Sequence, residues 1–168
     1  MSKAFTDEEA PDPGPVVRPP PRLAPGEIRY VTPEGQAALR GDVARIRAER
    51  AAAEALPEAG RAGRLAELDR RTQVLEATLA TLTVLGPESA PEGRVGFGSW
   101  VTVEDEDGAR HAWRLVGPDE SDPRHGLVSA SSPVGEALLG RAAGDVVEVD
   151  RPGGARELVV VEVRRTPA

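Results

Sequence analysis

Apolar residues recur at helical spacing in the first half of the chain. Leu39, Val43 and Ile46 follow one another at steps of four and three, and the same register continues through Arg50 to Ala53. Residues at these steps share one face of an α-helix, so the pattern predicts an amphipathic helix over residues 33–55. The polar Arg50 in this register weakens the apolar face toward the far end of the helix.

The residues that flank this segment are those that begin and end helices. Thr32 is a good N-cap, Pro33 suits the first helical position, and Glu34 places an acid in the first turn. Pro57 and Gly60 then interrupt the pattern. The predicted helix has 23 residues and a length of roughly 35 Å.

A second helical segment carries a cleaner apolar seam and ends before Gly86 and Pro87. Its seam residues are Leu65, Leu68, Thr72, Leu75, Leu79 and Leu82. The two seams can bury each other only if the chain folds back, which predicts an antiparallel helical hairpin. The pattern leaves open whether this hairpin serves an intramolecular bundle or a dimer, or whether it is a probe whose tip reaches a remote site.

The apolar period changes from that of helices to that of strands after residue 88. Val95, Phe97, Val101 and Val103 alternate with small or polar residues, and Asp107 with Gly108 is a typical hairpin turn. A return strand to residue 117 is expected next, followed by strands near 127–129, 146–149 and 158–163 and one short helix over 133–139. This order predicts a small α+β domain with an antiparallel sheet.

Charge and composition divide the 168 residues into three parts. Residues 1–26 are rich in proline and carry a net charge of −1, residues 27–87 are neutral, and residues 88–168 carry −6. We expect a disordered tail, a coiled-coil hairpin and a globular domain with these three boundaries. A total charge of −7 argues against nucleic-acid binding as the main activity, because such binding requires clustered basic residues.

Several classes of protein are excluded or disfavoured by what the composition lacks. No apolar run approaches the roughly 20 residues of a membrane-spanning helix, and no secretory signal is readable, so a cytoplasmic protein is expected. The absence of cysteine excludes thiolate chemistry, and the two histidines cannot alone form a typical zinc site. We predict no metal site.

Two groups of charged residues are candidates for binding. Asp119, Glu120 and Asp122 lie in one predicted loop and could face a basic partner, although from the sequence alone an ordinary polar loop explains them somewhat better. At the expected turn of the hairpin, Glu58 is accompanied by Arg61 and Arg64. These two cations oppose the binding of another cation there.

The order of short motifs along residues 30–164 resembles that of the Gre-family (GreA/GreB-like) transcription elongation factors. The matching segments are Tyr30-Val31-Thr32-Pro33-Glu34-Gly35, Gly93-Arg94-Val95-Gly96-Phe97-Gly98, Trp113-Arg114-Leu115-Val116-Gly117 with Asp119-Glu120, Ser132-Pro133 with Ala137-Leu138-Leu139-Gly140, Gly144-Asp145, and Arg151-Pro152-Gly153-Gly154. The resemblance implies a coiled coil followed by an FKBP-like domain, and bacterial RNA polymerase as the partner, with RNA and DNA contacted only indirectly.

Members of the family insert the coiled coil into the polymerase secondary channel, where acids at the tip help the polymerase to cleave backtracked RNA. The resemblance therefore implies no cofactor beyond magnesium in the polymerase active site, and no independent enzyme activity. We expect polymerase contact through Asp119, Glu120, Asp122, Ser129, Ser132 and Pro133. At the tip this sequence departs from the family, because only Glu58 is acidic near the turn and the helices are shorter.

The primary hypothesis is a monomeric polymerase-binding regulator without strong stimulation of transcript cleavage, although the leucine seam leaves a dimer open. One alternative is a genuine cleavage factor that uses Glu58 with Glu67 or Asp69. Another is a stand-alone FKBP-like binding module or a regulator of nucleotide metabolism.

Overall fold

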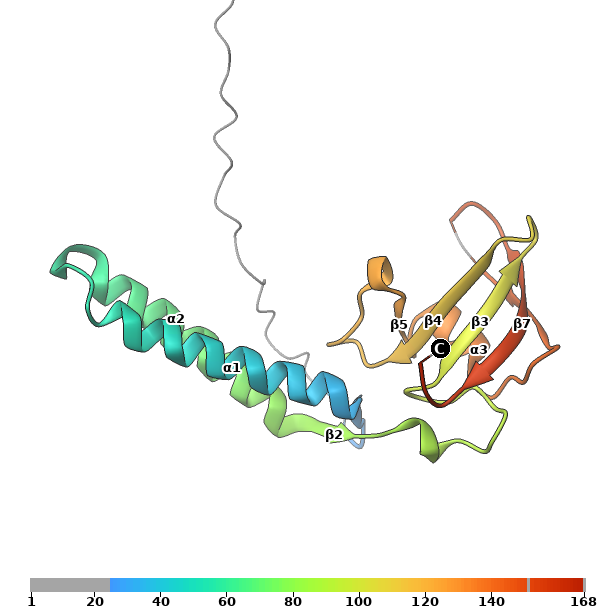
Figure 1. The fold of residues 1–168 in the computed structure, drawn as a ribbon, viewed down its shortest axis with the longest axis horizontal. Coiled ribbons are helices and arrows are strands. Elements are labelled where there is room, and N and C mark those ends of the chain that lie inside the picture. The colour runs from blue at the N-terminus through green and yellow to red at the C-terminus, as the bar shows by residue number, and fades with distance from the viewer. Residues whose placement is uncertain (1–24, 151, 168) are drawn as a thin grey trace, which may run out of the picture.

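The computed structural model describes residues 25–150 and 152–167. The predicted tail therefore lies outside the described residues, except for its last two positions. Figure 1 shows a helical hairpin that projects from a small sheet domain, with the hairpin base against the domain and the turn at the far end. The α+β class confirms the prediction from the sequence, and so does the order of two long helices, three strands, one short helix and two strands, to which the structure adds two short strands at the hairpin base.

The hairpin consists of α1 (Pro33–Ala53) and α2 (Glu58–Thr81). Its buried side chains come from the two predicted seams, namely Val43, Ile46, Ala53, Leu68 and Leu75, with Leu39, Leu65 and Leu79 packed around them. The first helix ends two residues before the predicted position and is about 32 Å long. The seam pattern was thus a reliable guide to which faces pack.

The N-terminus of α1 is capped as predicted. The Thr32 hydroxyl accepts a hydrogen bond of 3.0 Å from the Gly35 backbone N–H, and Pro33 occupies the first turn. At the opposite end of the hairpin, Ala59 and Gly60 break the helical geometry at the start of α2. Gly60 has a φ of 86°, which glycine adopts at no steric cost.

A small parallel sheet at the hairpin base was not predicted. It joins β1 (Arg29–Val31) to β2 (Leu82–Val84), with Val31 opposite Val84. The prediction that the second helix includes Leu82 was therefore wrong. Backbone pairing with β1 replaces the last helical turn, although Leu82 continues the heptad spacing.

The C-terminal sheet has the order β5-β4-β3-β7-β6. Its strands are β3 (Trp100–Asp105), β4 (Arg110–Val116), β5 (Leu127–Ser129), β6 (Val146–Val149) and β7 (Arg156–Arg164), accompanied by α3 (Pro133–Leu138) and the 3₁₀ turns η1 (Pro87–Ser89) and η2 (Pro123–His125). The prediction of a wholly antiparallel sheet was wrong for one pair, because β4 and β5 run parallel. The connection over residues 117–126 carries the chain back to the level of Arg114, so that β5 runs alongside the last three residues of β4.

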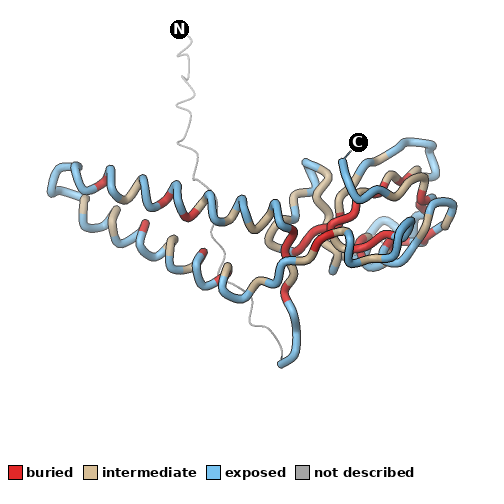
Figure 2. The backbone as a smooth tube through the Cα atoms, turned by 60° about the horizontal axis from the view of Figure 1, so that its bottom comes forward, coloured by how far each residue is buried: buried red, intermediate tan, exposed pale blue. Residues whose placement is uncertain are grey.

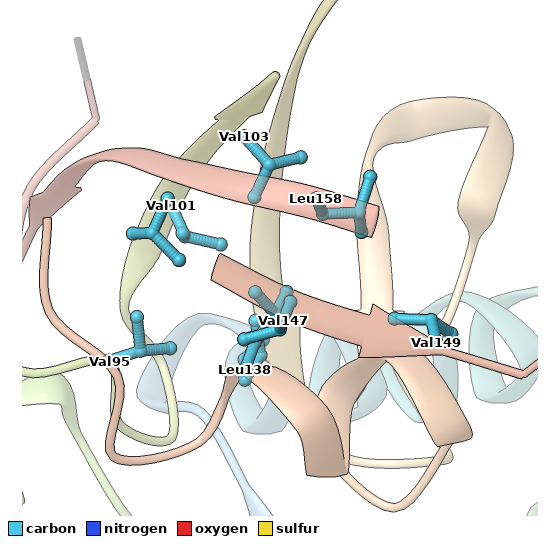
Figure 3. Packing of buried hydrophobic residues seen from close by; sticks show 9 residues of the cluster. Val95, Val101, Val103, Leu138, Val147, Val149 and Leu158 are labelled. Carbon is cyan, nitrogen blue, oxygen red and sulfur yellow. The ribbon is translucent and has the colours of Figure 1, made fainter. Parts of the chain in front are cut away.

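The core of this domain is built from valine and leucine on the inner face of the sheet and on α3 (Figure 3). Val101 and Val103 occupy the predicted inward positions of β3. The strand predicted to begin near Val95 begins at Trp100 instead. Val95 nevertheless packs in the core, where its backbone N–H donates to the Arg141 carbonyl at 2.7 Å and its carbonyl accepts from Gly140 N–H at 2.8 Å.

The hairpin and the domain have separate cores that approach each other only at the hairpin base. Figure 2 shows buried residues concentrated in the domain and at this base, whereas the helices alternate between buried and exposed positions up to an exposed turn. Surfaces at the base are therefore formed by both units, and surfaces at the tip by the hairpin alone.

Candidate functional site

The hairpin tip presents one acidic side chain that has no partner within the described residues. Glu58 is exposed at the start of α2, beside the exposed Leu56. Arg61 reaches back across the turn, where its Nη1 lies 3.5 Å from the Glu54 carbonyl oxygen. The turn therefore combines one free carboxylate with a neighbouring guanidinium group.

The other acids near the tip are held in ion pairs. Arg64 binds Glu67 at 3.0 Å and Glu49 at 3.3 Å. Arg50 binds Glu54 at 2.8 Å and also pairs with Asp69. The two alternative partners considered for Glu58, namely Glu67 and Asp69, are thus paired with arginine. Glu67 also lies about 9 Å along the helix from its first regular residues.

Three of the predicted contact residues lie together between β5 and α3. Ser132 is the N-cap of α3, with its hydroxyl 3.1 Å from Gly135 N–H, and Pro133 is the first helical residue. The Ser132 hydroxyl also donates to the Ser129 carbonyl at 2.6 Å. These hydrogen bonds hold the segment in one shape, as the capping signal in the sequence indicated.

Asp122 lies near the other end of β5 from Ser129. Its carboxylate accepts a 3.1 Å hydrogen bond from Arg124 N–H, and the His125 Nδ1 lies 2.6 Å from Asp122 Oδ2. The hydrogen bond with His125 holds the pKa of Asp122 below its usual range. Asp122 therefore remains an exposed anion at the edge of the sheet at neutral pH.

A groove of about 420 Å³ lies where the hairpin base meets the domain. Its walls are mainly apolar: Ile28, Tyr30, Leu85, Phe97, Val116, Pro118, Ala130 and Leu139 contribute, together with Glu27, Arg29, Gly117, Ser131 and Glu136. Ile28 and Leu139 are 55% and 39% exposed. Ala130 and Ser131 belong to the segment between Ser129 and Pro133, so this groove borders three of the predicted contact residues.

Asp119 and Glu120 face the hairpin instead of solvent. The Asp119 carboxylate binds the Arg29 guanidinium in a bidentate pair, in which the Nε–Oδ2 distance is 2.6 Å. Glu120 accepts hydrogen bonds from the backbone N–H and the hydroxyl of Thr32. We call these four residues the interdomain cluster. Both carboxylates are engaged in these intramolecular contacts, and direct contact of Asp119 and Glu120 with a partner stays a prediction.

Comparison with known proteins identifies the family. Residues 90–165 match the family described as "Transcription elongation factor, GreA/GreB, C-term". A GreB of Pseudomonas aeruginosa is 38% identical over 164 residues, in a match that covers 89% of this chain and 96% of the relative. The chain belongs to the GreA/GreB family.

Other relatives match a shorter part of this chain. A GreB of Yersinia pestis is 42% identical over 62% of this chain and 61% of its own length, and a GreA of Alkalilimnicola ehrlichii is 41% identical over 58% of this chain and 63% of its own. Among solved structures, GreA factor homolog 1 of Thermus thermophilus is 28% identical, with 82% of this chain and 99% of that chain covered at a TM-score of 0.39.

Within its described residues, this GreA/GreB-family protein has no group of three or more His, Cys, Asp or Glu side chains that could hold a metal ion. In the same residues, no helix is both long enough and apolar enough to cross a membrane. The acidic run over residues 104–107 spans the end of β3 and the start of the β3–β4 turn, where Asp105 binds His111 and the Ala109 backbone.

The groove at the hairpin base is the feature that sequence reasoning missed. Ile28 contributes to it from a segment without helical or strand periodicity, whereas Phe97 belongs to the predicted alternating pattern but lies ahead of β3, which begins at Trp100. Tyr30 lies in the unpredicted β1, and its ring packs against Phe97 with centroids 5.9 Å apart. The available signal was the presence of large apolar residues in segments that otherwise read as loops.

Proposed function

We propose that this GreA/GreB-family protein binds bacterial RNA polymerase and regulates transcription elongation, with its hairpin in the secondary channel and its C-terminal domain at the channel rim. Such a partner would place the protein in the bacterial cytoplasm. The observation that carries the proposal is the exposed apolar groove at the junction of hairpin and domain. Exposed apolar surface of this kind is typical of sites that bind another protein.

The residues around the groove suit a polymerase surface that carries both apolar and basic residues. Glu27 and Glu136 line the groove, and Asp122 lies at the neighbouring sheet edge. The C-terminal segment carries six more acids than bases. This charge would steer and orient a basic partner, while apolar contact in the groove would provide affinity. We assign the docking surface to the groove with Asp122, Ser129, Ser132 and Pro133.

The tip supports regulation without strong stimulation of RNA cleavage. Delivery of a metal ion to the polymerase requires carboxylates that are close together and free. In the described residues of the tip, Glu58 is free, whereas Glu54, Glu67 and Asp69 are paired with arginine. Any magnesium involved would belong to the polymerase active site, and the protein itself would catalyse no reaction.

Stalled, backtracked elongation complexes with purified polymerase test this function. We expect the protein to bind and to alter the fraction of complexes that resume elongation, without releasing short 3′ RNA fragments above the background of polymerase alone. Release of fragments that is lost on Glu58→Ala would instead establish the cleavage factor considered above. Absence of polymerase binding at micromolar concentrations would overturn the proposal.

The docking surface has a matched pair of substitutions. Ile28→Arg in the groove should weaken polymerase binding at least tenfold, because it places a charge in an apolar contact. Val146→Arg on edge strand β6 is the control, since Val146 is 54% exposed and lies outside the groove. Equal affinities of the two variants would show that the groove is not the docking site. Asp122→Arg should weaken binding by a smaller factor that decreases with salt.

A further inference from the structure

Hairpin and domain have separate apolar cores, and at the hairpin base the Tyr30–Phe97 pair is accompanied by polar contacts that can determine the direction in which the hairpin projects. Inter-domain contacts that are small and polar ordinarily allow relative motion. Here the base of α1 is instead held by the interdomain cluster, in which Arg29 and Asp119 are only 6% and 13% exposed. A bidentate pair of this kind fixes both distance and orientation.

Glu120 adds a second connection to the start of α1. One carboxylate oxygen accepts from Thr32 N–H at 2.9 Å and from Gly117 N–H at 3.2 Å, and the other accepts from the Thr32 hydroxyl. The same hydroxyl accepts from Gly35 N–H as the helix cap. The helix cap and the domain contact therefore share the Thr32 hydroxyl, and α1 cannot tilt away from the domain without breaking the hydrogen bonds between Glu120 and its N-cap residue.

Two glycines allow this close approach. A Cβ at Gly35 would overlap the Glu120 carboxylate, and a Cβ at Gly117 would overlap the Tyr30 carbonyl oxygen. Arg114 supports the same arrangement from the sheet, since its Nη2 donates to Glu34 at 2.8 Å and its Nε donates to the Gly98 carbonyl at 3.2 Å. Glu120 from the 117–122 loop and Arg114 from β4 thus both bind residues at the start of α1.

We propose that Asp119 and Glu120 are positioning residues that fix the direction of the hairpin relative to the docking surface. The hairpin acts as a lever, because α1 is about 32 Å long and a tilt of about 10° at its base moves the tip by about 5 Å. A protein bound through its domain would then present its tip at one defined place. The role in transcription rests on the proposed function, whereas the geometric role does not.

A distance measurement on the free protein tests the geometric role. The chain contains no cysteine, so Ala62→Cys at the tip and Asp107→Cys at the β3–β4 turn allow two spin labels for pulsed electron paramagnetic resonance. We expect one narrow distance distribution. Glu120→Ala should broaden it at least twofold, whereas Glu120→Gln, which keeps an acceptor for the backbone N–H groups, should restore most of the narrow distribution.

Two further variants separate positioning from general destabilisation. Gly35→Ala should broaden the distribution in the native background but add nothing in Glu120→Ala, since the overlapping carboxylate is then absent. Glu92→Ala is the control, because Glu92 is exposed and its side chain has no hydrogen bond or ion pair within the described residues. Narrow distributions in both Glu120→Ala and Gly35→Ala, with circular dichroism unchanged, would overturn the proposal.

Polymerase assays show whether the geometry matters for function. Glu120→Ala should lower the effect on stalled complexes at least tenfold more than it weakens polymerase binding, because the groove residues remain in place. An unchanged effect together with a broadened distance distribution would overturn the role of positioning in regulation. If the native protein did not bind polymerase, the proposed function would fail, and the distance distributions would still decide the geometric proposal.

Discussion

The tip and the base of the hairpin both contain arginine–carboxylate pairs, but the two ends differ in burial. At the tip, Arg50 is 37% exposed and its partner Asp69 is 54% exposed. At the base, Arg29 is 6% exposed and Asp119 is 13% exposed. Exposed pairs contribute little to stability, whereas removal of one partner from a buried pair leaves a charge without compensation. The same residue types are therefore expected to contribute little stability at the tip and much more at the base.

The largest expected difference in stability is between the loss of the acid in the buried pair and the loss of the acid in the exposed pair. Asp119→Ala should lower the free energy of unfolding by about 3 kcal/mol, because the buried Arg29 guanidinium loses its partner and Nη1 already lacks one within the described residues. Asp69→Ala should cost less than about 1 kcal/mol. Urea unfolding followed by circular dichroism measures both. Equal losses would contradict the distinction between the two ends.

Two glycine substitutions at the tip should change the free energy of unfolding by intermediate amounts of opposite sign. A Cβ meets nothing within 4 Å at either Gly60 or Gly63. Gly60→Ala should nevertheless cost about 1 kcal/mol, since Gly60 has a φ of 86°. Gly63→Ala should stabilise by about 0.5–1 kcal/mol, because alanine favours a regular helix. Thermal unfolding of the two variants gives the comparison, and stabilisation by both would show that the turn adopts another conformation.

The smallest expected effect is the loss of one ion pair at the hairpin base at acid pH. The hydrogen bond from Arg114 is the main cause that lowers the pKa of Glu34 below its ordinary value of 4.5. This contact therefore stabilises the folded state fully above about pH 4.5, and the contribution disappears as the pH falls through the lowered value. Glu34→Gln should lose less than about 1 kcal/mol at pH 7, because Glu34 is largely exposed, and nothing at pH 2.

Unfolding curves at both pH values check this prediction, with Glu92→Gln as the control for loss of an unpaired carboxylate. If the loss of stability in Glu34→Gln persisted unchanged at pH 2, the lost interaction would not be ionic. A deficit that grows at pH 2 would reverse the expected sign.

Local signals in the sequence predicted most of the fold because they concern contacts between near neighbours. The Thr32 and Ser132 caps, the Asp107-Gly108 turn and the two leucine-rich seams lie within a few residues of what they organise. The parallel pairing of β1 with β2 was missed, since the three-residue strands are about 50 residues apart and show no periodicity. The end of α2 was misplaced for the same reason.

The candidate site was predicted unevenly. Ser132 and Pro133 were recognisable as a helix start, and Glu58, Arg61 and Arg64 do lie at the tip. The contacts of Asp119 and Glu120 were not foreseeable from the sequence, because a loop of acids reads the same whether it faces solvent or a buried arginine. The apolar groove required both units in place, since its walls come from distant segments.

By itself, the sequence determined the helical hairpin, the small α+β domain, the distribution of charge between them and the shortage of free acids at the tip. These follow from periodicity, capping and composition, which act over short distances along the chain. Only the tertiary structure decided where the acids of the 119–120 loop point, how the hairpin is held and where an apolar groove opens. Those features depend on desolvation and on residues about 90 positions apart in the chain, which no local pattern records.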